Sequence, residues 1–447
     1  MTNRIFKRKI YGRLLRWKER SGGSTALLIE GARRVGKSTI ACEFGRREYR
    51  SYICIDFSNA PAEVIAAFNQ VYKPDRLFLL LQTYYDVVLY PRESLIIFDE
   101  VQFCPKARQA VKHLVADGRY DYIETGSLVS IRQNVRDILI PSEEEHMTMF
   151  PMDYEEFLWA TGQDTTMALI RSAFESLRPM GDAVNREMMR RFRLYMLVGG
   201  MPQAVDAYLE HNNFEAVDAV KRRIIELYMN DLRKIDPTGR MSRIFTTIPS
   251  SLAKGKLRFT AREIFENSSV AELGEVWFDL EESQTVNFCY RCTDPNVGMS
   301  LFRDSASFKL YMGDTGLFVT LAFWDKDVSE NVIYKKLLSD KLEADLGYVY
   351  ENVVAQILQA SGHRLFYYTA PADPLGKKSY EVDFLLAKGA KIEPLEVKSS
   401  GYRAHRSLDF FAERYSGRIT RPVVLYTKDI HNDGQTLYLP VYMTCLL

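Results

Sequence analysis

TALLIEGARRVGKSTI, residues 25–40, decides the fold of the N-terminal part of the chain. An apolar run that begins at Ala26 predicts a buried strand, a glycine-bounded loop follows it, and a helix begins near Lys37. The loop from Gly31 to Ser38 matches G-x-x-x-x-G-K-[ST] at every fixed position. This pattern is typical of a loop whose backbone N–H groups surround a polyphosphate. Because the strand–loop–helix context is present, we predict a P-loop rather than a chance glycine turn before a surface helix.

The residue types in this loop have separate roles in binding a nucleoside triphosphate. The two glycines allow the backbone to curve around the phosphates, and the helix start adds the positive end of its dipole. We expect Lys37 to reach the β- and γ-phosphates, and the Ser38 hydroxyl to coordinate Mg²⁺. The predicted nucleotide-binding residues are Gly31, Arg34, Val35, Gly36, Lys37, Ser38 and Thr39.

A second apolar run, SLIIF at residues 94–98, ends in Asp99-Glu100. Such a run is typical of a buried parallel strand, and open α/β sheets bind their ligands at the carboxyl edge. We predict that Asp99 holds Mg²⁺, directly or through water, and that Glu100 polarises the attacking water. The alternative is that the two carboxylates only cap the following helix.

Two more strands are predicted at residues 51–57 and 120–124. The second is followed by Thr125-Gly126-Ser127, so a hydroxyl lies at the same edge of the sheet as the P-loop. We assign a catalytic role to Ser127, together with Lys37 and Glu100. Two alternatives stay open for this hydroxyl: contact with the γ-phosphate or the attacking water, or capping of the next helix.

The composition of the 447 residues is that of an ordinary globular protein, with 47% hydrophobic and 26% charged residues. The net charge of +1 excludes a global basic surface for nucleic acid. No apolar run approaches the roughly 20 residues that span a bilayer. Six scattered cysteines and the lack of a signal peptide favour reduced thiols in the cytoplasm. Residues 4–20 predict a basic amphipathic helix docked on the core, rather than one that binds nucleic acid or a membrane.

LIEGARRVGKST, LIIFDEVQ and ETGS together resemble the AAA-type P-loop ATPases that carry a C-terminal DUF4143-type region. The archaeal-type ATPases with a PD-(D/E)xK-like tail are close relatives. The resemblance continues through MFPMDYEEFL (149–158), LVGGMPQAV (197–205) and FKLYMGDTGLF (308–318). It implies ATP and Mg²⁺ as cofactors, a helical lid after the core, and assembly into a homo-oligomer. The family's Gly-Arg pair is replaced by PSEEEHMT (141–148), so no arginine is assigned to ATP hydrolysis.

The order Glu351, Asp383, Glu396 and Lys398 resembles the core of the PD-(D/E)xK nucleases. Strand periodicity places Glu381 with Asp383 on one face, and Glu396 with Lys398 on one face. We predict that the three motif carboxylates bind Mg²⁺ and that Lys398 orients a metal-bound water or stabilises charge at the phosphate. The alternative is a cluster of interstrand ion pairs that supports folding only weakly.

We therefore predict an α/β protein in four segments. These are an AAA-type ATPase core (1–160), a helical lid or linker (161–240), a winged-helix domain (241–310) and a restriction-endonuclease-like DUF4143 domain (311–447). The predicted function is Mg²⁺-dependent ATP hydrolysis coupled to the binding of DNA or of a protein partner. Two alternatives stay open: a nucleotide-gated protein-binding or signalling module with an inactive nuclease-like domain, and an ATP-regulated nuclease.

Overall fold

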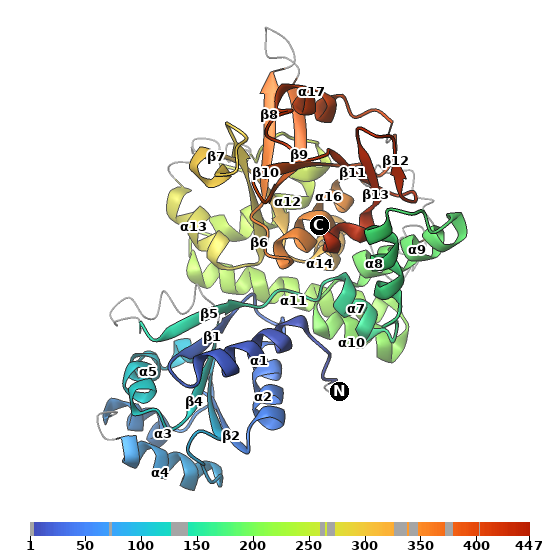
Figure 1. The fold of residues 1–447 in the computed structure, drawn as a ribbon. Helices are drawn as coiled ribbons and strands as arrows, with labels where there is room; N and C mark the ends of the chain where they lie inside the picture. Colours follow the sequence, from blue (N-terminus) through green and yellow to red (C-terminus); the bar gives the residue numbers. More distant parts are fainter. Residues whose placement is uncertain are drawn as a thin grey trace. The chain divides into compact units, whose positions relative to one another are not determined.

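The computed structural model describes residues 4–70, 74–126, 142–259, 264–265, 273–325, 338, 347–371, 379–401 and 403–447. The chain forms two compact units, Met1–Phe150 and Pro151–Leu447, shown in Figure 1. Ser127, to which we assigned a catalytic role, lies outside the described residues. Among the helices that are described, none is both long enough and apolar enough to cross a bilayer.

The first unit is built on a five-stranded parallel sheet with the order β2-β3-β4-β1-β5. Its strands are β1 Ala26–Glu30, β2 Ser51–Asp56, β3 Ser94–Asp99, β4 Asp121–Gly126 and β5 Glu144–Thr148. Every residue of β1, β3 and β4 is buried, as expected for parallel strands covered on both faces. The strands predicted at 51–57, 94–98 and 120–124 are confirmed.

Helices cover both faces of this sheet (Figure 1). One face packs Leu28, Ile96 and Phe98 into a core with residues of α3 Ala62–Ala67, α4 Pro74–Tyr85 and α5 Pro105–Asp117. The other face contacts α2 Lys37–Glu48, on which α1 Lys9–Ser21 packs. Because successive strand residues point to opposite faces, each strand supplies both cores and the unit has three layers.

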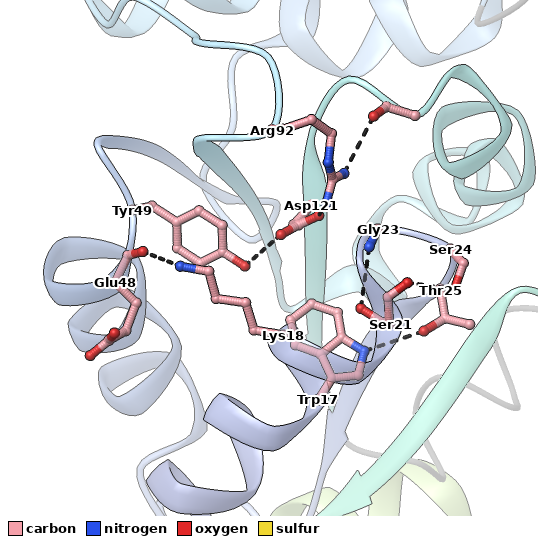
Figure 2. Close-up of polar contacts among 11 residues, drawn as sticks. Trp17, Lys18, Ser21, Gly23, Ser24, Thr25, Glu48, Tyr49, Arg92 and Asp121 are labelled. Atoms are coloured by element: carbon pink, nitrogen blue, oxygen red, sulfur yellow. Dashed lines mark hydrogen bonds and ion pairs between the residues drawn. The ribbon is translucent and has the colours of Figure 1, made fainter.

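Helix α1 is the predicted basic amphipathic helix, and its apolar side chains are buried: Ile10, Leu14 and Trp17. Figure 2 shows how it is held where the strands begin. The Trp17 indole N–H donates to Thr25 Oγ1 at 3.3 Å, just before β1. The Lys18 ammonium lies 4.0 Å from the centroid of the Tyr49 ring, whose hydroxyl donates to Asp121 at 2.7 Å. These contacts confirm that α1 docks on the core.

The second unit begins with helices, and most of them fall within the segment predicted as a helical lid or linker (161–240). These are α7 Tyr154–Ala160, α8 Thr166–Ser176, α9 Asp182–Val198, α10 Pro202–His211, α11 Phe214–Ile235 and α12 Arg240–Ala253. Gly199-Gly200-Met201 interrupts these helices, since α9 ends at Val198 and α10 begins at Pro202. Helices α13 Gly274–Glu282 and α14 Thr315–Ala322 follow later in the chain.

The two glycine-containing motifs of this unit lie against each other. Asp314 caps α14 by accepting the Leu317 N–H at 2.9 Å, and it also accepts the Gly200 N–H at 2.6 Å. A Cβ on Gly316 would lie 2.5 Å from the Gly199 Cα, so the backbones approach too closely for any side chain. The motifs at 197–205 and 308–318 are therefore two halves of one packing contact.

The second unit also contains an eight-stranded mixed sheet with the order β12-β13-β11-β10-β9-β8-β6-β7. The strands are β6 Val286–Cys292, β7 Arg303–Met312, β8 Phe366–Pro371, β9 Ser379–Lys388, β10 Lys391–Val397, β11 Val423–Tyr426, β12 His431–Asn432 and β13 Leu437–Pro440. Strand β10 returns antiparallel to β9, with Gly389 in the turn at φ 60°. Strand β11 extends the sheet in parallel with β10.

Two helices pack on opposite faces of this sheet. Helix α17 Arg406–Arg414 packs Phe411 against Val382 in an apolar core. Asp383, the next residue of β9, lies on the opposite face, where α16 Gly347–Ala360 contacts β6, β7 and β10. The face with Asp383 is thus the one that meets the helix carrying Glu351.

The hairpin of β6 and β7, most of which lies within the range predicted as a winged-helix domain (241–310), joins this same sheet. Strands β6 and β7 pair antiparallel, and β6 continues in parallel with β8 at Tyr290 and Arg291. The predicted boundary between residues 310 and 311 consequently falls inside β7. A separate winged-helix domain at 241–310 stays a prediction.

Candidate functional site

The P-loop follows β1, the strand between β4 and β5. Gly31 has φ 153°, and a Cβ there would lie 2.3 Å from the Met149 carbonyl oxygen, so only glycine fits without moving backbone. Gly36 is the N-cap of α2 with φ 101°, in the region that glycine favours. Arg34 is left-handed as well, with φ 70°. The loop therefore has the curvature that the motif predicted.

Lys37 lies at the start of α2 with 7% of its surface exposed. Its ammonium donates to two carbonyl oxygens of the loop itself, Gly31 at 2.9 Å and Ala32 at 3.0 Å. Burial lowers the pKa of Lys37 to about 8, although the nearby Glu100 and Asp99 carboxylates oppose that shift. The carbonyls are neutral acceptors, and a charged phosphate oxygen forms a stronger hydrogen bond with an ammonium group. The ammonium is thus placed to exchange the loop carbonyls for phosphate.

Ser38 and Asp99 meet at the edge of the sheet. The Ser38 hydroxyl donates to Asp99 Oδ1 at 2.6 Å, and the Thr125 hydroxyl donates to the same oxygen. Asp99 ends β3 and Thr125 lies in β4, the strand between β3 and β1. Hydroxyl and carboxylate oxygens are the ligands that Mg²⁺ prefers, so these residues fit the predicted metal. The contact of Thr125 was not predicted, since we had assigned the hydroxyl at this edge to Ser127.

Glu100 follows β3 in a left-handed conformation, with φ 53°. Non-glycine residues adopt this region rarely, and such strain is concentrated at functional sites. Its N–H approaches Thr125 Oγ1 at 3.4 Å, and the Gln102 amide donates to its carboxylate. The backbone turn therefore places the two carboxylates in different surroundings: Asp99 is 9% exposed, and Glu100 is partly exposed.

The other predicted loop residues differ in exposure. Val35 is buried, whereas Arg34 and Thr39 are exposed. The Val35 carbonyl accepts a hydrogen bond at 2.9 Å from Arg8, whose second nitrogen donates to the Phe150 carbonyl at 2.6 Å. Arg8 thus joins the P-loop to the segment after β5. No local pattern identified Arg8, because its partners are distant in sequence.

The C-terminal carboxylates are brought close together by α16, β9 and β10. Asp383 accepts the Val397 N–H at 2.8 Å, and Lys398 forms an ion pair with Glu396 at 2.8 Å. Burial, followed by repulsion from Glu351 and Glu396, raises the pKa of Asp383 well above its usual range. Burial likewise raises the pKa of Glu396. The predicted residues are therefore neighbours.

Lys309 of β7 occupies this carboxylate cluster, and the sequence had not indicated it. Its side chain is 6% exposed, and its ammonium pairs with Glu381 and, at 3.5 Å, with Glu351. The Tyr311 hydroxyl donates to the same Glu351 oxygen at 3.2 Å. Burial lowers the pKa of Lys309, but Glu351 and the other negative charges outweigh it, so the pKa is raised well above its usual value.

The predicted metal role of these carboxylates is not tested by the arrangement. Among the residues that the structure describes, no group of three or more His, Cys, Asp or Glu side chains is arranged to hold a metal ion. A cation of the chain itself, Lys309, balances the cluster instead. The assignment of Mg²⁺ to Glu351, Asp383 and Glu396 stays a prediction.

Three family models match the chain. Residues 23–158 match the model described as AAA domain, and residues 346–443 match DUF4143, a domain of unknown function. Between them, residues 189–328 match DUF8612, another domain of unknown function. No curated protein matches the chain significantly. The AAA match supports ATP binding and hydrolysis as the class of activity.

Similar solved structures include a Walker-type ATPase of Pyrococcus abyssi, with 17% identity, a TM-score of 0.42, and coverage of 71% of this chain and 96% of that chain. The Orc1 protein of Aeropyrum pernix in complex with DNA has 13% identity, a TM-score of 0.29, and coverage of 76% and 93%. Cdc6p of Pyrobaculum aerophilum has 12% identity, a TM-score of 0.27, and coverage of 77% and 98%. None of these TM-scores reaches 0.5, so the similarities assign no function.

Proposed function

We propose that this chain, whose residues 23–158 match an AAA domain and whose residues 346–443 match DUF4143, hydrolyses ATP with Mg²⁺ and couples hydrolysis to the binding of nucleic acid or a protein partner. The observation that carries the proposal is the pair of hydrogen bonds from the Lys37 ammonium to its own loop, beside the Ser38–Asp99 contact. A cation held by neutral carbonyls can be released to an incoming phosphate.

Each residue has one role in this proposal. Lys37 and the loop N–H groups bind the β- and γ-phosphates, and Ser38 and Asp99 would hold Mg²⁺. The metal, when bound, neutralises charge on the phosphate oxygens. Glu100 orients the attacking water and accepts its proton as ATP and water give ADP and phosphate. Thr125 fixes the Asp99 carboxylate through its hydroxyl.

ATP turnover with and without duplex DNA tests the coupling. Phosphate release from the full chain in Mg²⁺ is expected to depend on Lys37, and to be unaffected by Lys112→Ala on the exposed side of α5. Stimulation by DNA supports nucleic-acid coupling. If DNA neither binds nor stimulates, that form of coupling is removed and a protein partner is left. Calorimetry that detects no heat of binding with any nucleoside triphosphate, in a folded sample, overturns the whole proposal.

A second candidate is a nucleotide-gated binding module whose DUF4143 region does not cut nucleic acid. The buried Lys309 favours it, because an ammonium group already balances Glu351 and Glu381. Nucleic acid incubated with the wild type and with Asp383→Asn, in Mg²⁺ or Mn²⁺, is then expected to give identical products. Cleavage by the wild type that Asp383→Asn abolishes would instead establish the third function, an ATP-regulated nuclease.

A further inference from the structure

Two cysteines face each other beside the nucleotide-binding site. Cys42 lies on α2, one helical turn after Ser38, and Cys54 lies on β2. Their sulfur atoms are 3.1 Å apart, and both thiols are free and partly exposed. Cys292 and Cys445, by contrast, donate to the backbone carbonyls of Asp294 and Tyr442.

We propose that Cys42 and Cys54 form a reversible disulfide that acts as a redox switch on the P-loop helix. A disulfide requires its two sulfurs to be about 2.05 Å apart, so closure asks for a movement of about 1 Å. Partial exposure allows a small oxidant to reach the pair. The hydrogen bond between the two thiols lowers the pKa of Cys42, which favours the thiolate that begins thiol–disulfide exchange.

The reaction is balanced with a small-molecule disulfide such as oxidised glutathione as the oxidant. The Cys42 thiolate attacks one sulfur of that disulfide, forms a mixed disulfide and releases one glutathione thiolate. Cys54 then loses its proton to water, and its thiolate attacks the Cys42 sulfur and releases the second glutathione. Two protein thiols are oxidised, and one glutathione disulfide is reduced to two thiols. An added dithiol reverses both steps.

The position of the pair connects this chemistry to the nucleotide site. Ser38 and Cys42 share one face of α2 because they are four residues apart. Cys54 lies on β2, which runs beside β3 in register, so that Asp56 is opposite Asp99. A covalent bond at this point ties the helix that carries Lys37 to the strand beside the one that carries Asp99. This part of the inference rests on the proposed ATP hydrolysis.

The test uses the full chain, treated with oxidised glutathione and then with an alkylating reagent. Intact-mass analysis is expected to show two fewer alkylated thiols per chain, and unreduced peptide mapping to join the peptides of Cys42 and Cys54. Cys42→Ser and Cys54→Ser each abolish the joined peptide. Cys445→Ser, which removes a partly exposed thiol elsewhere, leaves it unchanged. The proposal is overturned if Cys42 and Cys54 both remain free thiols after this treatment, or if they carry only separate glutathione adducts.

ATP turnover of the same samples tests the switch. Oxidation is expected to lower turnover of the wild type by roughly tenfold, since a misplacement of about 1 Å can reduce catalysis by up to about 100-fold. Dithiothreitol restores it, and Cys42→Ser does not respond to the oxidant. A joined peptide with unchanged turnover overturns the switch. A reduced chain without any turnover removes the proposed function, while the mapping still decides whether the disulfide forms.

Discussion

The P-loop and the C-terminal carboxylate cluster each contain one buried lysine, and the partners of the two lysines differ. Lys37 donates to the neutral carbonyls of Gly31 and Ala32, and burial lowers its pKa to about 8. Lys309 pairs with the carboxylates of Glu351 and Glu381, and their charges raise its pKa. A lysine that is held by neutral groups is available to an anionic ligand, whereas a lysine paired with carboxylates already has its counter-charge.

The largest expected effect tests the availability of Lys37. Lys37→Ala removes the only positive side chain that we place on the β- and γ-phosphates, so ATP turnover is expected to fall by about 1,000-fold, equivalent to about 4 kcal/mol. Steady-state phosphate release measures it. Lys309→Met is the matched control and is expected to leave turnover of the folded chain within about twofold, a change of under 1 kcal/mol. A similar loss in both variants would contradict the difference between the two sites.

The next effect concerns stability. Lys309→Met leaves Glu351 and Glu381 without their buried cation, and breaking such a pair costs about 3 kcal/mol or more of unfolding free energy. Urea denaturation of the full chain, followed by fluorescence, measures the change. The double variant Lys309→Met with Glu381→Gln is expected to recover part of the loss, because one uncompensated charge is removed with the ammonium. Equal stability of Lys309→Met and the wild type would show that the ammonium is not needed.

Lys221 of α11 shows whether burial alone lowers the pKa of a lysine outside the nucleotide-binding loop. It is fully buried, it donates to the carbonyls of Leu197 at 2.7 Å and Gly316 at 3.2 Å, and burial lowers its pKa to about 8. The folded chain therefore loses this proton near pH 8, whereas the unfolded chain keeps it until about pH 10.5. Between these values the unfolded state binds more protons, so raising the pH favours folding.

The measurement compares the wild type with Lys221→Met at pH 7 and pH 9.5. The stability of the wild type relative to the variant is expected to rise by roughly 2 kcal/mol over this range. Guanidinium denaturation in the presence of a reductant gives both values. If the difference in unfolding free energy between the two proteins is the same at both pH values, the pKa of Lys221 is not lowered. Burial beside two carbonyls would then not explain the lowered pKa of Lys37.

The nucleotide-binding residues could be predicted from the sequence, because each lies in a short local pattern. Lys37 and Ser38 belong to one continuous motif, and Asp99 ends an apolar strand, so their roles follow from patterns a few residues long. The sequence placed a hydroxyl group after the strand at 120–124, but only the structure showed that the Thr125 hydroxyl contacts Asp99. Two glycines followed closely by Pro202 are an equally local signal for a helix break, whereas the packing of Gly199 against Gly316 is not a local feature.

The part that could not be predicted depends on contacts between distant segments. Lys309 lies between Phe308 and Leu310, and this alternation predicts a polar side chain facing water. It instead faces Glu351, 42 residues later in the chain, because β6 and β7 join the sheet formed by β8 to β13. Arg8 reaches the Val35 carbonyl across 27 residues in the same way. Charge alone does not reveal which partner a side chain finds.

The smallest expected effect isolates burial as the cause of the cost at Lys309. Arg50 and Glu93 form the same kind of cation–carboxylate pair at 3.2 Å, but both side chains are 57% exposed. Glu93→Gln leaves Arg50 stacked on the Tyr90 ring at 3.6 Å and removes only the carboxylate charge. Because water and salt screen an exposed pair, unfolding free energy is expected to change by about 0.5 kcal/mol or less. Glu381→Gln makes the same chemical change in the buried cluster. Urea denaturation is expected to show a loss of unfolding free energy several times larger than that of Glu93→Gln. Equal losses at the two positions would mean that burial does not determine the strength of the Lys309 pair.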